Sequence, residues 1–276
     1  MPSKRRVWQS DDWRADGIAA VGEFVGTFTF LLLGLGGIQA ARTASEISGT
    51  SGGSMKVTVP SVDFLLMAAT SMGAAFNPNI ALMLMVLGVI TPVRFVFYAT
   101  AQMAGAVAAA AVLRGILPGP LLVNVSPSNE AYAEMFLTFG LCMTVIMLAV
   151  EKNKSTPLAP LAIGFALFST QLAGINFTGA AVNTARAFGP AAATGDFVGS
   201  HWIYWVGPTL GALLAAGLYK GMLYVHWWEL NPGADATKDE EAHYRKTAGI
   251  GKHAIAAHSL FDDRLIDIRT YILINV

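Results

Sequence analysis

The stretch GAAFNPNIAL, Gly73 to Leu82, carries Asn-Pro-Asn in the middle of an almost wholly apolar region. Asn is a preferred N-cap residue, and Pro is favoured at the first helical position, where its missing N–H costs nothing. The sequence therefore predicts a short helix that begins near Pro78 and is capped by Asn77.

A similar polar break, AAVNTARAFGPA, occupies residues 180–191. It predicts a second short helix, capped by Asn183, that begins near Thr184 and is ended early by Gly189-Pro190. A helix that starts inside a membrane exposes unpaired N–H groups and the positive end of its dipole at the first turn. Such a start needs a protein partner or a water-filled cavity.

The composition indicates an integral membrane protein. The chain has 276 residues, of which 54% are hydrophobic and 13% charged, with zero formal net charge and a mean hydropathy of +0.52. Zero net charge gives no attraction to nucleic acid. The sequence contains no metal-spaced His/Cys cluster, P-loop or G-x-S-x-G motif. We therefore expect neither an enzyme nor a protein that needs a metal or cofactor.

A bilayer core of about 30 Å requires about 20 apolar residues of helix. Five stretches meet this requirement: Ile18–Ala40, Phe95–Leu113, Ala131–Val150, Leu158–Ile175 and Trp202–Tyr224. A sixth, around residues 57–71, is short and contains Pro60 and Asp63. Basic residues gather before Ile18–Ala40, between Ala131–Val150 and Leu158–Ile175, and after Trp202–Tyr224. They share one side of the membrane only if six segments span, so we expect six spans with both termini in the cytoplasm of a multi-pass protein.

The chain repeats itself. Asn77 and Asn183 are 106 residues apart, and so are Gly105 and Gly211. With three spans per repeat, an odd number, the second copy is inserted upside down relative to the first. The two half-helices would then meet N-terminus to N-terminus near the membrane midplane, where their dipoles repel a cation and their Asn amides contact whatever passes.

Three charged residues inside the spans and re-entrant segments are candidate site residues. Glu23 and Glu134 occupy similar places in the two repeats, 111 residues apart, and we expect them to hold backbone N–H groups of the re-entrant segments rather than to relay protons. Arg186 lies three residues after Asn183, and a charge at membrane depth indicates function by default. The alternatives are that the Asn residues act only as caps and that Arg186 only ties down loop carbonyls.

Several stretches resemble one known family: GEFVGTF, FNPN, AQMAGA, AEMFLTFG, LAIGFAL, FTGAAVNTARAFGPA and HWIYWVGP, in this order. They resemble the major intrinsic protein family, the aquaporins and aquaglyceroporins, and look most like its fungal water channels. The resemblance implies an all-α membrane protein with six transmembrane helices and two re-entrant half-helices in an inverted repeat. It also implies a homotetramer of four pores in a lipid bilayer, with passive water transport along an osmotic gradient.

The resemblance further implies roles for particular residues. The pore midplane would hold the two NPA-type motifs, which comprise Asn77, Pro78, Asn79, Asn183, Thr184 and Ala185. The extracellular constriction would hold Arg186, Gln171 and Ala180. The usual triplet of the family is Asn-Pro-Ala twice. We therefore expect Asn79, which is larger than the usual Ala, to narrow the pore midplane. Thr184 lacks the pyrrolidine ring with which the usual Pro fixes the first turn of the helix.

The predicted domains are a cytoplasmic segment 1–17, an aquaporin-like channel domain 18–225 with repeats at about 18–113 and 131–225, and a cytoplasmic tail 226–276. The predicted function is a proton-excluding water channel of the plasma membrane or an internal membrane. In the family, Asp after the constriction Arg marks glycerol conduction, and this chain has Ala187 there.

Two alternative functions stay open, an aquaglyceroporin and a non-conducting aquaporin-like protein. The second alternative rests on the altered triplets and on the short stretch around residues 57–71, in which the 14 residues from Val57 to Thr70 would cover about 21 Å of the core as a helix. The five histidines lie at or beyond the start of the last predicted span and form no recognisable ligand set, so we expect them on the surface.

Overall fold

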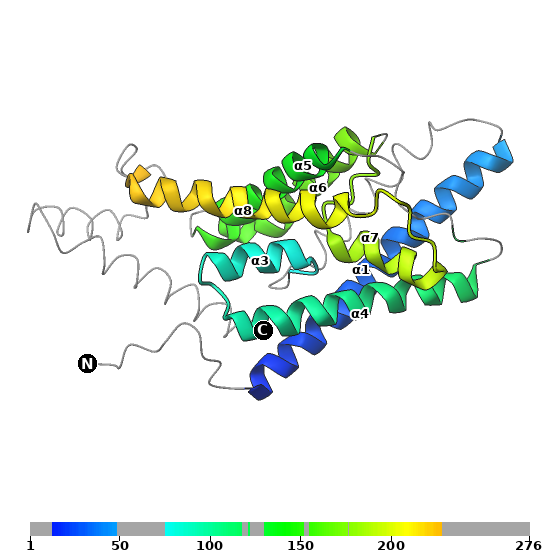
Figure 1. The fold of residues 1–276 in the computed structure, drawn as a ribbon, viewed down its shortest axis with the longest axis horizontal. Coiled ribbons are helices and arrows are strands. Elements are labelled where there is room, and N and C mark those ends of the chain that lie inside the picture. Colours follow the sequence, from blue (N-terminus) through cyan, green and yellow to red (C-terminus); the bar gives the residue numbers. More distant parts are fainter. Residues whose placement is uncertain are drawn as a thin grey trace, which may run out of the picture.

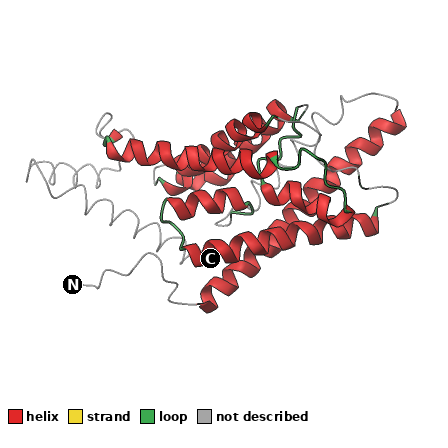
Figure 2. Cartoon of the chain, viewed as in Figure 1, coloured by secondary structure: helices red, strands yellow, loops and turns green. Residues whose placement is uncertain are grey.

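The computed structural model describes residues 13–48, 75–117, 121, 130–151, 155–175 and 177–227. Within these residues every regular element is helical (Figure 2). The predicted span around residues 57–71 lies outside them.

The described elements follow one another as α1 (Trp13–Ser48), α3 (Pro78–Val86), α4 (Pro92–Ile116), α5 (Ala131–Val145), η1 (Ile146–Val150), η2 (Thr156–Leu158), α6 (Ala159–Gly174), α7 (Thr184–Thr194) and α8 (Ile203–Tyr224). Four stretches among them are long and apolar enough to cross a membrane: α1 over Trp13–Ala40, α4, α5 with η1, and η2 with α6. The last helix, α8, has 22 residues, about 33 Å at 1.5 Å per residue.

The two short helices lie in the middle of the bundle. Figure 1 shows α3 and α7 between α1 and α4 on one side and α5, α6 and α8 on the other, pointing toward one another from opposite directions. Within each repeat the first helix packs on the last, α1 on α4 and α5 on α8. Each half-helix packs on the last helix of the other repeat, α3 on α8 and α7 on α4. The crossed packing holds the two half-helix starts together at the centre.

Close packing within each repeat depends on the two glycines that are 106 residues apart. A Cβ on Gly105 in α4 would lie 2.7 Å from the carbonyl oxygen of Phe24 in α1. A Cβ on Gly211 in α8 would collide with the carbonyl oxygen of Met135 in α5. Only glycine allows these backbones to approach so closely, as in other small-residue contacts between membrane helices.

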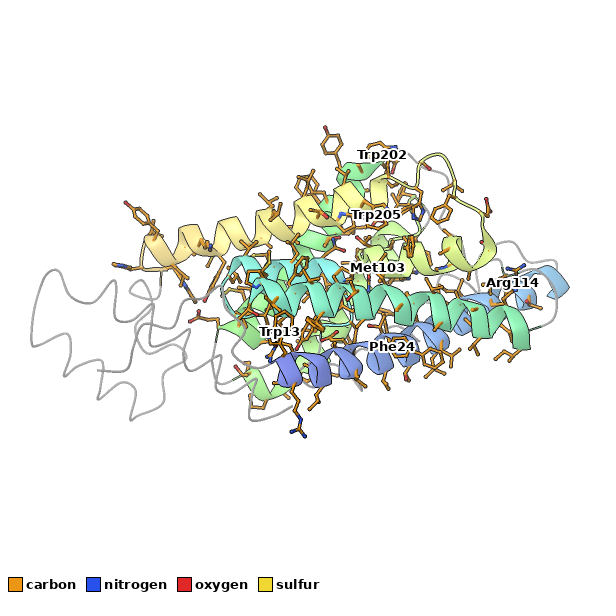
Figure 3. All side chains as sticks on the ribbon, turned by 60° about the horizontal axis from the view of Figure 1, so that its bottom comes forward. Trp13, Phe24, Met103, Arg114, Trp202 and Trp205 are labelled. Atoms are coloured by element: carbon orange, nitrogen blue, oxygen red, sulfur yellow. The ribbon has the colours of Figure 1, made fainter. Side chains whose placement is uncertain are left out.

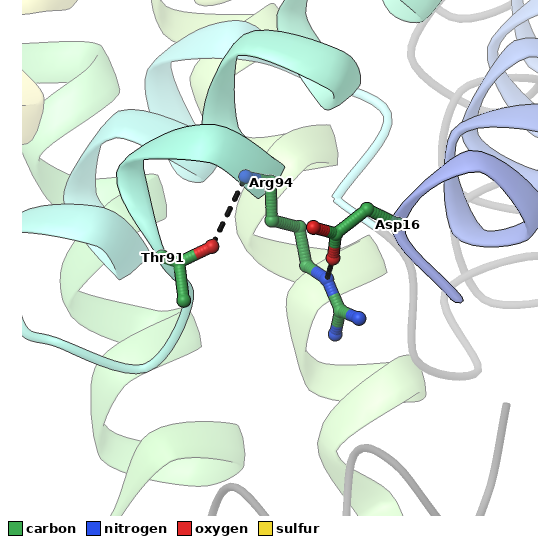
Figure 4. A network of polar contacts seen from close by, with 3 residues as sticks. All are labelled: Asp16, Thr91 and Arg94. Carbon is green, nitrogen blue, oxygen red and sulfur yellow. Dashed lines mark hydrogen bonds and ion pairs between the residues drawn. The ribbon is translucent and has the colours of Figure 1, made fainter. Parts of the chain in front are cut away.

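Two arginines fasten the ends of α4. Near its first turn, Arg94 donates from Nε to Asp16 of α1 at 2.7 Å, and the side chain of Thr91 accepts the backbone N–H of Arg94 at 3.1 Å (Figure 4). In the last turn, Arg114 donates to the carbonyl of Ala193 at 2.6 Å. That carbonyl belongs to the last turn of α7, where the helix dipole favours a cation.

Large apolar side chains project from the outside of the bundle. Figure 3 shows Trp13 and Phe24 along α1 and Trp202 and Trp205 at the start of α8, and all four are exposed. Soluble proteins rarely expose apolar surface in such continuous runs, whereas lipid chains cover it without cost.

Candidate functional site

Both predicted half-helices are present, and they begin at Pro78 and Thr184. Their caps adopt nearly the same extended backbone, with φ −154° and ψ 117° at Asn77 and φ −156° and ψ 112° at Asn183. The side-chain oxygen of each cap accepts the N–H of the residue two positions later, at 2.9 Å in both. The similar sequences therefore produce the same local structure in the two repeats.

The end of α7 differs from the sequence prediction. The helix continues through Gly189 and Pro190 to Thr194, and Gly195 ends it in the left-handed region at φ 74°. A proline removes one intrahelical hydrogen bond, which packing can offset, whereas the left-handed glycine redirects the chain. Gly189 is required for packing, because a Cβ there would lie 2.6 Å from the carbonyl oxygen of Ala106 in α4.

The two caps bind each other's repeat reciprocally. Asn77 donates from Nδ2 to the carbonyl of Val182 at 2.8 Å, and Asn183 donates from Nδ2 to the carbonyl of Phe76 at 2.9 Å. These bonds bring the positive ends of the two half-helices together. Each amide uses one N–H in this way, and its second N–H has no partner among the described residues.

Glu23 and Glu134 support the segments that lead into the caps. Glu23 accepts the N–H groups of the two residues directly before Asn77, at 2.8 and 2.9 Å. Glu134 accepts those of the two residues directly before Asn183, at 2.9 and 2.8 Å. Both carboxyl groups are buried. This is the scaffold geometry that their similar places in the two repeats predict.

The residue before each cap has a strained backbone. Phe76 has φ 47° and Val182 φ 44°, both in the left-handed region that non-glycine residues rarely adopt. Such a conformation costs on the order of 1–3 kcal/mol per residue and persists only where its surroundings hold it. Here the carboxylate bonds hold the N–H side and the reciprocal amide bonds hold the carbonyl side.

The three predicted constriction residues are brought together. The guanidinium of Arg186 donates to the carbonyls of Gly179 and Ala180 at 3.1 and 2.6 Å and to Oε1 of Gln171 at 3.4 Å. Gln171 in turn donates from Nε2 to the carbonyl of Ala180 at 2.7 Å. Arg186 is 7% exposed, and no carboxylate in the described part of the chain lies within ion-pair distance of it. Its charge is therefore held by carbonyl and amide dipoles.

The third residues of both triplets are buried. The side chain of Asn79, which the sequence predicts to narrow the pore midplane, binds Thr184 of α7 and Thr209 of α8. Ala185 is fully buried and contributes its N–H to the Asn183 cap.

Three supporting residues escaped the sequence analysis. Gln102 donates to Glu23 at 2.7 Å, and the hydroxyl of Thr178 donates to Glu134 at 2.6 Å. Tyr204 donates from its hydroxyl to the carbonyl of Thr178 at 2.6 Å. The sequence signal for Gln102 was its polarity, since it is the polar residue of the apolar stretch AQMAGA. Its partner Glu23 could not be inferred by comparing the repeats, because the second repeat has Pro208 at the position that corresponds to Gln102.

His201 is buried, which corrects the expectation of surface histidines. Its ring packs against Phe197 and Tyr204, with centroid distances of 5.1 and 5.8 Å, and the residue is 7% exposed. Burial lowers the pKa of this imidazole below its ordinary value of 6.5, so the ring is neutral at physiological pH.

The comparison with known families agrees with this geometry. The family model described as Major intrinsic protein matches residues 10–219, and the chain belongs to this family of membrane channels. It is a channel protein rather than an enzyme, because the relatives it matches are aquaporins.

Several similar proteins come from fungi. An aquaporin of Laccaria bicolor is 42% identical over 258 residues, covering 86% of this chain and 79% of the relative. Aquaporin-1 of Laccaria bicolor is 43% identical over 252 residues, with the same coverages. Among solved structures, the aquaglyceroporin from Plasmodium falciparum superposes with a TM-score of 0.60 at 21% identity, covering 74% of this chain and 95% of that one. These matches confirm the predicted fold class.

Proposed function

We propose that this protein is a water-selective channel that excludes protons and carries water passively along an osmotic gradient. The observation that carries the proposal is the reciprocal pairing of Asn77 and Asn183 at the facing starts of α3 and α7. It leaves one amide N–H of each residue to donate to a water molecule. Two fixed donors orient a passing water without binding it tightly.

The same arrangement disfavours cations. Each half-helix start carries about half a positive charge, and both starts face the same point. A hydronium ion there meets two positive ends and has lost its bulk hydration, and Arg186 adds a full positive charge at the constriction. Proton exclusion follows from these three positive features.

The constriction favours water over glycerol. Of its described residues, Arg186 and Gln171 present polar groups, and a polyol requires an apolar wall for its carbon chain. Ala187, where glycerol-conducting members have Asp, packs in an apolar cluster with Ala181, Ile203 and Tyr204. These features support a water channel over a glycerol channel.

An aquaglyceroporin is the second candidate. Its support is the likeness in fold to the Plasmodium falciparum aquaglyceroporin, which at 21% identity concerns the fold alone. A non-conducting protein is the third candidate. It rests on the short stretch around residues 57–71, which lies outside the described residues.

Stopped-flow light scattering on proteoliposomes distinguishes the three candidates. After a sucrose jump we expect shrinkage about tenfold faster than in protein-free vesicles, and after a glycerol gradient re-swelling at the protein-free rate. Tenfold corresponds to a barrier lower by about 1.4 kcal/mol. Fast glycerol re-swelling would favour the aquaglyceroporin, and slow shrinkage the non-conducting protein.

Four further features of the molecule belong to the proposal. The homotetramer rests on the family resemblance, and the cytoplasmic termini rest on the side-consistent basic clusters. The plasma membrane or an internal membrane is the proposed location. The domain boundaries proposed are those predicted from the sequence, with the channel domain at residues 18–225.

A further inference from the structure

The two triplets, residues 77–79 and 183–185, can be compared with each other position by position because they belong to the two copies of one repeat. At the second triplet position one copy has Pro78 and the other Thr184, and at the third position one copy has Asn79 and the other Ala185. Thr184 and Asn79 are thus the two positions at which one repeat departs from an Asn-Pro-Ala pattern. They lie in different repeats, 105 residues apart.

These two residues contact each other. The backbone N–H of Thr184 donates to Oδ1 of Asn79 at 3.0 Å. The Thr184 hydroxyl lies 3.0 Å from the same oxygen and 2.9 Å from the carbonyl of Tyr204, to one of which it donates its single proton. Asn79 donates from Nδ2 to the hydroxyl of Thr209 at 3.3 Å. Both residues are at least 96% buried.

The Thr184 N–H explains why the two departures occur together. Thr184 is the first residue of α7, where a backbone N–H has no partner within the helix. Proline at this position has no N–H, so its counterpart Pro78 needs no acceptor. Threonine brings a buried N–H, and a buried unpaired donor is costly. Alanine at position 79 could not accept it, whereas the amide oxygen of Asn79 does.

We propose that Asn79 and Thr184 form a clasp between the repeats that positions the start of α7 against the start of α3. Asn79 is a positioning residue, because it acts on the pathway through the helix that carries Asn183 and Arg186. Each member of the clasp is unfavourable without the other. The proposed positioning of α7 does not depend on which molecule passes through the channel. Its expected effect on water flow rests on the proposed function.

Proline fits the backbone at position 184. The residue before a proline must be extended, and Asn183 has φ −156° and ψ 112°. Asn77, which does precede a proline, has φ −154° and ψ 117°. The change Thr184→Pro therefore removes the N–H without demanding a new backbone conformation.

The test compares the wild type with four variants: Asn79→Ala, Thr184→Pro, and the double variants Asn79→Ala with Thr184→Pro and Asn79→Ala with Thr184→Val. Thermal unfolding of the purified full-length protein and water permeability per protein are measured for each. We expect Asn79→Ala to lower the unfolding midpoint by about 3–8 °C, because it leaves the Thr184 N–H unpaired. Thr184→Pro lowers it as well, because it leaves the Asn79 oxygen without its donor.

The two double variants differ in that N–H and in the proline ring, and Thr184→Pro alone reports the effect of the ring. Both lose the Asn79 side chain and the Thr184 hydroxyl, but valine keeps the backbone N–H and proline does not. We expect the proline double variant to regain the wild-type midpoint to within about 2 °C and most of the water permeability. The valine double variant stays as low as Asn79→Ala. A residue that only fills space would not produce this selective rescue.

Additive losses in the proline double variant would overturn the clasp, as would equal behaviour of the two double variants. If the single variants do not fold, a folded proline double variant supports the clasp and an unfolded one overturns it. A wild type without water permeability would count against the proposed function alone, because the unfolding midpoints still decide the clasp.

Discussion

At the scale of single residues, Arg186 combines a full charge with carbonyl and amide partners. Its bonds to Ala180 and Gln171 join α6, the loop before α7 and α7 itself. A guanidinium held by dipoles keeps its charge, which a carboxylate partner would neutralise. In the proposed function this residue limits both the width of the constriction and the charge of what enters.

We predict that Arg186→Ala raises glycerol re-swelling of proteoliposomes about tenfold, because a barrier lower by about 1.4 kcal/mol gives that factor. Arg114→Ala serves as the matched control, since Arg114 also donates to a carbonyl of the α7 region, at 2.6 Å to Ala193, but takes no part in the constriction bonds. An unchanged solute profile in Arg186→Ala would contradict the role assigned to this residue.

At the scale of elements, the helices are positioned by backbone approach and by caps. Gly105 and Gly211 allow α4 and α8 to touch the backbones of α1 and α5. In a bilayer the apolar surface of a helix gains little by leaving lipid for protein, so close packing must supply the stabilisation. A methyl group added at such a contact has no space to occupy.

We predict opposite effects for two alanine substitutions in α8. Gly211→Ala forces a Cβ against the carbonyl of Met135 and should destabilise the protein by about 1–3 kcal/mol. Gly217→Ala meets no atom within 4 Å and should be neutral or stabilising by up to about 1 kcal/mol, because alanine is the better helix former. Thermal unfolding in detergent measures both. Equal midpoints for the two variants would refute the close approach of α8 and α5.

At the scale of the whole molecule, the two repeats are joined by crossed contacts. Each half-helix packs on the last helix of the other repeat, and the Asn caps bind each other's loop. Neither half can therefore complete the centre alone. An inverted repeat places such a centre at mid-membrane, with the starts of α3 and α7 facing each other.

The proposed orientation places Ser155 in the cytoplasm and Asp196 outside. Both residues are exposed, and the natural cysteine, Cys142, is fully buried. We predict that a membrane-impermeant thiol reagent labels Asp196→Cys in intact cells but labels Ser155→Cys only after permeabilisation, with the wild type unlabelled as the control. The reverse pattern would place the termini outside.

The sequence by itself determined the local features of this protein. The starts of α3 and α7 follow from Asn caps and short-range helix preferences, and the inverted repeat follows from the spacing of Asn77 and Asn183. The grouping of Arg186, Gln171 and Ala180 followed from the family resemblance. Each of these depends on a few neighbouring residues or on the order of motifs along the chain.

Only the tertiary structure decided which distant groups become partners. Asn79 turns to Thr184 because the other repeat presents an unpaired N–H there, and no local rule contains that information. The helix α7 passes Pro190 because its packing against α4 offsets one lost hydrogen bond. Buried His201 instead packs on two residues of its own repeat, Phe197 and Tyr204. For Asn79 and for α7 the free energy comes from contacts that form only when the two repeats meet, so the sequence of either segment alone could not predict the outcome.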